Sequence, residues 1–229
     1  MASPPPSRAA ALSALARVTL KRSTRGALVW IALAIAFVPA LAAGGLRAAG
    51  TSNGNIAFDL IQAVLVILAP MFIASSIGEE LEQRTAAYLW SRPVERWAIV
   101  AGKLLALAPM CAAFVVGGAL LAGLVGDATL RTAQPIIALA AGSLVSCAAV
   151  AGIATLLPRH AMIFAMLYLL LDLVPGELDG SLHIVSIGYA TRATAGLESS
   201  AVVTGAIALA AIAAFWLVIA GVRIRRLET

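Results

Sequence analysis

The sequence predicts an all-α membrane protein with six transmembrane helices, an N-terminal amphipathic interfacial helix and a cytoplasmic coupling helix between spans 2 and 3. Two observations are compositional: 62% of the 229 residues are hydrophobic and only 12% are charged. A soluble domain has about 25% charged residues, so this chain has too few charges to cover a water-facing surface. The third observation is that the apolar residues form blocks of about 20, the length that crosses a bilayer core.

Residues 1–26 are predicted to form a cytoplasmic tail and an amphipathic helix. The first six residues include three consecutive prolines and read as a disordered tail. Within residues 8–25, Arg17, Lys21 and Arg25 are spaced four apart and therefore share one helical face. Such a helix would lie on the inner membrane surface. The alternative is a solvated basic tail that only enforces the topology.

Residues 27–229 form one predicted transmembrane domain. Its predicted spans are residues 27–46, 58–77, 97–125, 135–157, 161–174 and 201–222. A cleaved signal peptide is the alternative for the first span, but the apolar run exceeds the usual 7–15 residues and a long basic region precedes it. The fifth span has about 21 Å of helix. Because that is short for a crossing, we expect tilt or polar extensions, followed by small outer or re-entrant helices.

The Lys and Arg residues are distributed unevenly over the two predicted sides of the membrane. Of the 16, only Arg47, Arg131 and Arg192 fall on the outer side. This positive-inside pattern places both termini and the segment between spans 2 and 3 in the cytoplasm, in a multi-pass protein of the inner (plasma) membrane. The lipid bilayer therefore accounts for the net charge of +5, and no nucleic-acid partner is expected.

A few polar side chains near the predicted spans are candidates for lining a transport pathway. Asp59 and Gln62 open the second span, and Asp172 ends the fifth. Charges near a membrane are costly and often functional, so these residues could line an outer vestibule. The alternative is that they are simply solvated at the outer interface.

The residues that support metal or nucleophile chemistry are few. His160 and His183 are the two histidines and lie on opposite predicted sides, so no metal site is expected. Cys111 and Cys147 lie inside apolar blocks and are expected to pack as small hydrophobes. The mixed segment 175–200 is predicted to be exposed, and no nucleophile and base are paired at membrane depth. An intramembrane enzyme is therefore the least supported class.

The charged segment of residues 78–96 is the most informative part of the sequence. Ser75 or Ser76 could cap a helix whose glutamate-rich first turn suits the positive end of the helix dipole. Pro93 ends that helix. The side chains predicted to share one face are Leu81, Thr85, Tyr88 and Leu89. A short helix with this ridge could dock in a groove of a soluble partner; an ordinary solvated loop is the alternative.

Three short motifs in and after this segment resemble the signature of type-2 ABC exporter permeases. They are Glu80-Leu81-Glu82-Gln83-Arg84-Thr85, Ser91-Arg92-Pro93-Val94-Glu95-Arg96 and Gly102-Lys103. The family typically has Glu-x-Glu-x-Gly-Thr, then Leu-Leu-Ser-x-Pro-Val-Ser-Arg, then Gly-Lys at the base of the third span. This sequence departs from the pattern at Arg84, Trp90 and Glu95, where the family has glycine, leucine and serine.

The resemblance implies a permease subunit that forms the membrane pathway for export. A second permease chain would complete a homodimer or heterodimer, and a coupling helix would sit on an ABC ATPase (nucleotide-binding) subunit. The residues assigned to this coupling are Glu80, Glu82, Arg84, Thr85, Tyr88, Leu89, Pro93 and Arg96. The alternative is a non-transporting membrane anchor or force-transmitting subunit docked to an ATPase.

The resemblance also places ATP and Mg on the partner ATPase rather than on this chain. Gly102-Lys103 is followed by Leu104, and no glycine stands at position 97, so these residues do not form a P-loop. No cofactor is therefore expected on this chain, and it is not expected to be an enzyme. The apolar spans fit an apolar or amphipathic cargo, although lipid-facing surfaces have the same composition.

Overall fold

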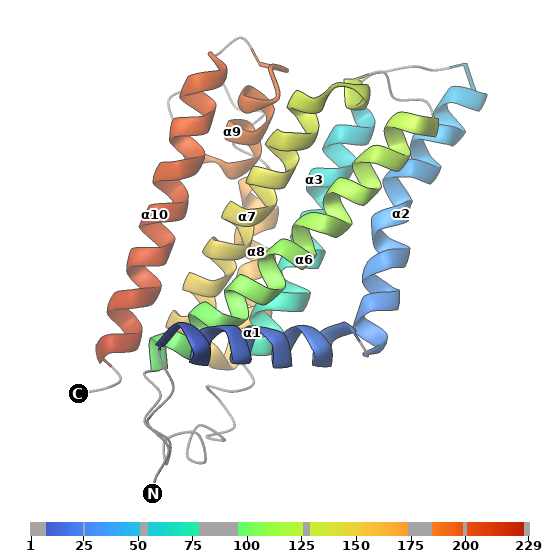
Figure 1. Cartoon of the computed structure of the whole chain (residues 1–229). Coiled ribbons are helices and arrows are strands. Elements are labelled where there is room, and N and C mark those ends of the chain that lie inside the picture. Colours follow the sequence, from blue (N-terminus) through green and yellow to red (C-terminus); the bar gives the residue numbers. More distant parts are fainter. Residues whose placement is uncertain are drawn as a thin grey trace, which may run out of the picture.

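The computed structural model describes residues 8–24, 26–50, 55–77, 96–125, 129–173, 185–198 and 201–226. The regular elements in these ranges are helices (Figure 1). The main ones are α1 (Arg8–Thr24), α2 (Ala27–Ala48), α3 (Ile56–Ala69), α6 (Arg96–Val125), α7 (Ala133–Leu156), α8 (Ala161–Asp172), α9 (Ile187–Thr194) and α10 (Val202–Arg226).

Five of the described helices are long and apolar enough to cross a membrane. They are Ala27–Ala48, Ile56–Ile77, Trp97–Val125, Ala133–Leu156 and Val202–Arg225. Each agrees with a predicted span to within a few residues. The predicted fifth span is α8, which has 12 residues, or about 18 Å of helix. The six-span count therefore stays a prediction, while the all-helical membrane class is confirmed.

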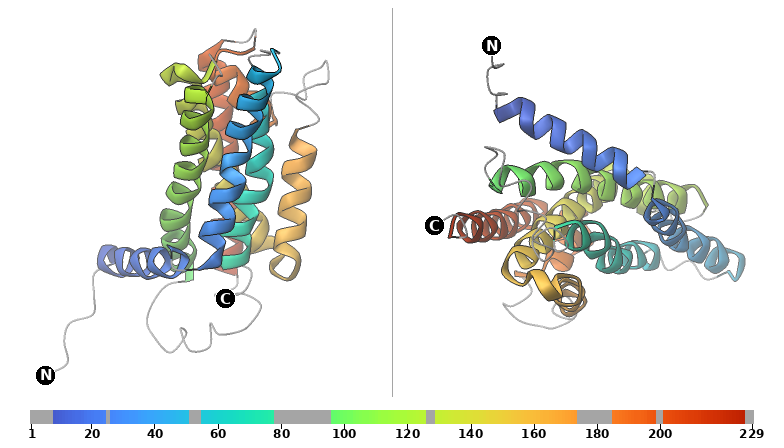
Figure 2. Two further views of the ribbon diagram at one scale, coloured as in Figure 1. Left: turned by 90° about the vertical axis from the view of Figure 1, so that its right-hand side faces the viewer. Right: turned by 90° about the horizontal axis from the view of Figure 1, so that it is seen from below.

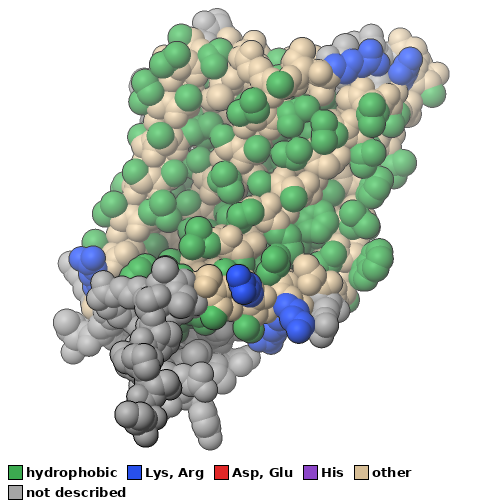
Figure 3. All heavy atoms as spheres, viewed as in Figure 1, with side chains coloured by type: hydrophobic (Ala, Val, Ile, Leu, Met, Phe, Trp, Pro, Cys, Tyr) green, Lys and Arg blue, Asp and Glu red, His purple; other side chains and the backbone are tan. Residues whose placement is uncertain are grey.

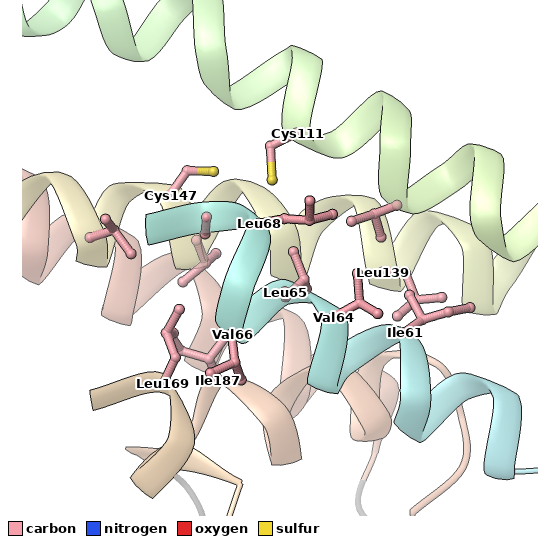
Figure 4. Close-up of a cluster of buried hydrophobic side chains, with 14 of the residues drawn as sticks. Ile61, Val64, Leu65, Val66, Leu68, Cys111, Leu139, Cys147, Leu169 and Ile187 are labelled. Carbon is pink, nitrogen blue, oxygen red and sulfur yellow. The ribbon is translucent and has the colours of Figure 1, made fainter. Parts of the chain in front are cut away.

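α7 and the second span form the centre of the bundle. In the most apolar stretch of each, 72% is buried within the protein, compared with 28% in α2 and 17% in α10. Cys111 of α6 and Cys147 of α7 face one another beside Leu68 of α3 (Figure 4), and both thiols are buried and free. They pack as small hydrophobes, as predicted. On the face shown in Figure 3, much of the surface between the two ends is apolar, as contact with lipid requires.

The two ends of the bundle differ in what covers them. α1 lies crosswise at one end, level with the bases of α2 and α6 (Figure 1), and runs alongside α6 when seen from below (Figure 2). We call this the α1 end. The short helix α9 lies toward the opposite end, between α7 and α10, which we call the α9 end.

The second span changes its winding just before the α1 end. After α3 it continues as a π-helix, Pro70–Ala74, and then as helix to Ile77. Proline has no N–H to donate, which is one cause of such local rewinding. The hydroxyl of Ser75 donates to the carbonyl oxygen of Met71, and the ring of Phe72 stacks on Phe114 of α6 with 5.9 Å between centroids. π-helical turns are frequent at functional sites, and only residues 75–77 separate this one from residue 78.

Candidate functional site

Polar groups gather at the α9 end around the start of helix α9. The carboxylate of Asp172, at the end of α8, accepts hydrogen bonds from the N–H groups of Ile187 (3.0 Å) and Gly188 (2.9 Å). The hydroxyl of Ser186 accepts from the N–H of Tyr189 (3.1 Å) and donates to the carbonyl oxygen of Asp172 (2.9 Å). A carboxylate at a helix N-terminus satisfies unpaired N–H groups and complements the helix dipole. Asp172 therefore connects the end of α8 to the first turn of α9 by hydrogen bonds.

The second span joins the same cluster through Gln62. This side chain is only 7% exposed, and its Nε2 donates to the carbonyl oxygen of Gly188 at 3.1 Å. A pocket of about 200 Å³ lies beside this contact, and Asp59, Gln62 and Asp172 all line it. The three residues predicted as pathway lining are thus brought together in one pocket, although they come from two helices that are far apart in sequence.

Arg192 of α9 lies in the same pocket and binds two carboxylates. Its Nη1 is 2.5 Å from an oxygen of Asp59, and its Nε is 2.7 Å from an oxygen of Glu198. Partial burial lowers the pKa of Arg192, but the hydrogen bonds and charges of Glu198 and Asp59 outweigh this effect, so its pKa is raised. The guanidinium therefore stays protonated. The sequence placed Arg192 on this side of the membrane but did not indicate the two ion pairs.

Replacement of Arg192 by methionine is expected to destabilise the protein by about 1–2 kcal/mol. Removing one partner of a fully buried ion pair costs about 3–5 kcal/mol, and we reduce this figure because the side chains of Arg192 and Asp59 are 21% and 46% exposed. At about 2–4 °C per kcal/mol, the midpoint of thermal unfolding in detergent should fall by about 2–8 °C.

The double variant Asp59→Asn/Arg192→Met should be more stable than Arg192→Met alone. In the single variant, Asp59 and Glu198 both lose the guanidinium that they bind, and the second substitution removes one of these two negative charges. Arg131→Met is a matched control, since the Nε of this exposed arginine donates to a backbone carbonyl, that of Gly123. Equal midpoints for Arg192→Met and Arg131→Met would contradict the prediction.

A second group of candidate residues lies at the α1 end, where α6 begins. A Cβ atom at Gly102 would lie 3.1 Å from the Cβ of Leu15 and 3.6 Å from the carbonyl oxygen of Leu12, so the absence of a side chain lets α1 approach α6 closely. The neighbouring Lys103 is 7% exposed, and its Nζ donates to the carbonyl oxygen of Ser76 in the second span. The Gly-Lys pair thus connects α6 to two other elements.

Most of the residues predicted to couple to an ATPase lie outside the described residues. These are Glu80, Glu82, Arg84, Thr85, Tyr88, Leu89 and Pro93, whereas Arg96 is the first residue of α6. The described chain reaches Ile77 at the α1 end and continues from Arg96 at the same end (Figure 1). His183 also lies outside the described part, within which no group of three or more His, Cys, Asp or Glu residues could hold a metal ion.

A family model for the ABC-2 family transporter protein matches residues 31–182. The match covers more than half of the chain. The matched residues include the three motifs, of which Gly102-Lys103 is one, and the pocket residues Asp59, Gln62 and Asp172. No curated protein matches the chain at a significant level.

Proposed function

The chain belongs to the ABC-2 transporter family, and we propose that it forms the membrane pathway through which an exporter moves its substrate, driven by ATP hydrolysis on a separate subunit. Membership confirms the family that the three motifs resemble. It identifies the chain as a multi-pass membrane protein and as the permease component of an ABC transporter. The export direction, the coupling to an ATPase and the dimer are parts of the proposal.

One observation supports the coupling most directly. The Nζ of Lys103 in α6 donates a hydrogen bond to the carbonyl oxygen of Ser76 in the second span. Residues 78–95 connect these two elements in the sequence. Gly102 brings α1 against the same point. The coupling helix predicted within residues 78–95 would then connect two elements that are bonded to each other. A force that a soluble subunit exerts on it would be transmitted to the second span and α6 together.

The remaining parts of the proposal follow from charge and from the family. The α1 end faces the cytoplasm, because most Lys and Arg residues fall on that side, and both termini are cytoplasmic in the inner (plasma) membrane. The partner there is an ABC ATPase that binds ATP and Mg, and a second permease chain completes the pathway. The pocket formed by Asp59, Gln62 and Asp172 is then an outer vestibule.

Reversal of charge at two glutamates tests the docking segment. In the double variant Glu80→Lys/Glu82→Lys, we expect the amount of ATPase subunit that co-purifies to fall by about tenfold or more. Like charges placed opposite each other at an interface cost several kcal/mol, and each 1.4 kcal/mol is a factor of ten in affinity. Membrane insertion should not change, because the segment is outside the spans.

The matched control is Glu177→Lys/Asp179→Lys, a charge reversal of the same size on the proposed outer side. It should retain the ATPase at the level of the unmodified chain. Unchanged retention in the Glu80/Glu82 variant would count against docking through residues 78–96.

A non-transporting anchor or force-transmitting subunit would use the same docking segment. Sealed vesicles that contain the chain and its ATPase separate the two functions. ATP-dependent movement of a cargo across the vesicle membrane supports the pathway, whereas ATPase binding without any movement supports the anchor.

A further inference from the structure

An apolar groove of about 320 Å³ lies between α2 and α6, away from the polar pocket at the α9 end. Its lining is formed by apolar side chains and glycines. They include Leu33 and Phe37 of α2 and Met110, Phe114, Gly117 and Leu121 of α6. Both helices are long and apolar enough to cross the membrane, so the groove lies between two candidate transmembrane helices.

Two neighbouring glycines of α6 explain why the groove is there. A Cβ at Gly118 would lie 2.6 Å from the carbonyl oxygen of Ala36, so this glycine allows α2 and α6 to touch. A Cβ at Gly117 would meet nothing within 4 Å. The first glycine therefore brings the helices together, and the second leaves an open volume beside the contact.

Two arginines lie above the groove at the α9 end. Nη1 of Arg47, in the last turn of α2, donates to the carbonyl oxygen of Val125 at 2.9 Å, and Nε of Arg131 donates to that of Gly123 at 3.3 Å. Both carbonyls belong to the last turn of α6, so both guanidinium groups lie at this end of α6. Figure 3 shows basic side chains gathered at this corner, above a largely apolar face.

The chemistry of these arginines suits an anion at the level of the lipid head groups. Both side chains are exposed, and each of these hydrogen bonds uses one of the five N–H donors of a guanidinium. Neither Arg47 nor Arg131 takes part in the ion pairs that Arg192 forms with Asp59 and Glu198. Planar guanidinium groups bind phosphate oxygens in a bidentate manner.

The depth and size of the groove decide what fills it. Leu121 is about 6 Å and Met110 about 22 Å along α6 from Val125, so the groove begins close beneath the arginines and extends through the roughly 15 Å of hydrocarbon in one leaflet. A helix of a second copy is about 10 Å wide, and that length of helix would need about 1,000 Å³. The groove is too small to enclose a helix and large enough for a single hydrocarbon chain.

We propose that this groove holds one acyl chain of a phospholipid from the leaflet at the α9 end, and that Arg47 and Arg131 bind its phosphate. The bound lipid sits against the lipid-facing side of α2 and α6, apart from the pocket of Asp59 and Arg192. The site rests on packing and charge and does not depend on the proposed transport.

Photo-cross-linking to the full-length chain in phosphatidylcholine vesicles tests the site. The probe is phosphatidylglycerol with a diazirine on one acyl chain, and labelled peptides are located by mass spectrometry. We expect labelling to concentrate on the groove-lining peptides of α2 and α6. Gly117→Trp, which fills the groove, and Arg47→Gln/Arg131→Gln, which removes the two charges, should each lower that labelling by about tenfold, or about 1.4 kcal/mol of affinity.

The matched control is Leu105→Trp, which adds the same bulk at an exposed position of α6 outside the groove and should label like the unmodified chain. Diacylglycerol with the same diazirine chain has no phosphate and should label the groove weakly in every variant. Equal labelling of the groove and of the exposed face of α10 would overturn the proposal, as would labelling that neither groove variant changes. Disulfide cross-linking of two copies through Phe37→Cys would also overturn it, because the occupant would then be a second chain.

Discussion

Replacement of Lys103 by methionine is expected to reduce ATP-driven transport by about tenfold or more while the chain still inserts and folds. Methionine keeps an apolar side chain of similar length and removes the ammonium that binds the Ser76 carbonyl. Hydrogen bonds to charged groups contribute about 1.5–3 kcal/mol, and each 1.4 kcal/mol is a factor of ten in an equilibrium. Without this bond, the two ends of residues 78–95 are held together less firmly, so a force on the segment is transmitted to both spans less effectively.

The measurement is ATP-dependent transport in sealed vesicles, with ATPase co-purification as a second readout. ATPase binding should be largely retained, because the docking surface itself is unchanged. Ser76→Ala is a control that should transport normally, because the acceptor is a backbone carbonyl that the substitution preserves. Lys103→Arg should restore part of the activity, since a guanidinium also donates but has a different shape. Normal transport by Lys103→Met would remove the main support for coupling through this contact.

The spans could be predicted from the sequence because each one is a local signal. A block of about 20 apolar residues must be helical in a bilayer, where every backbone polar group has to be satisfied within the chain. The arrangement of the spans could not be predicted in the same way. α7 and α2 have nearly equal mean hydropathy, 2.2 and 2.3, yet one is 72% buried and the other 28%. Lipid and protein interiors are similarly apolar, so hydrophobicity does not distinguish a central helix from a peripheral one.

The candidate site was predicted only in part, for a related reason. The sequence predicted that Asp59, Gln62 and Asp172 lie near the same membrane face, and in the structure all three line one pocket; their role in a pathway stays a prediction. The sequence did not show that Asp172 binds the first turn of α9, because that contact depends on how the chain folds back after α8. The bridge from Arg192 to Asp59 joins residues 133 positions apart, and a single sequence holds no signal at that separation.

Replacement of Gly205 by leucine is expected to destabilise the protein more than any other single change considered for the bundle. A Cβ at this position of α10 would lie 2.7 Å from the backbone nitrogen of Thr194 and 2.8 Å from the carbonyl oxygen of Ala190, both in α9. Backbone atoms cannot rotate away as side chains do, so α10 and α9 must separate. Overpacking of this kind costs about 3 kcal/mol, which corresponds to a fall of about 6–12 °C in the unfolding midpoint in detergent.

Gly221→Leu in the same helix is the matched control, because a Cβ there meets nothing within 4 Å. Leucine also favours the helix over glycine by roughly 0.5–1 kcal/mol, so this variant should unfold at the same temperature or slightly above the unmodified chain. The two substitutions are chemically identical and differ only in what stands opposite the glycine. If both variants lowered the midpoint equally, the effect would come from leucine in α10 in general, and the close packing of α9 on α10 would not be its cause.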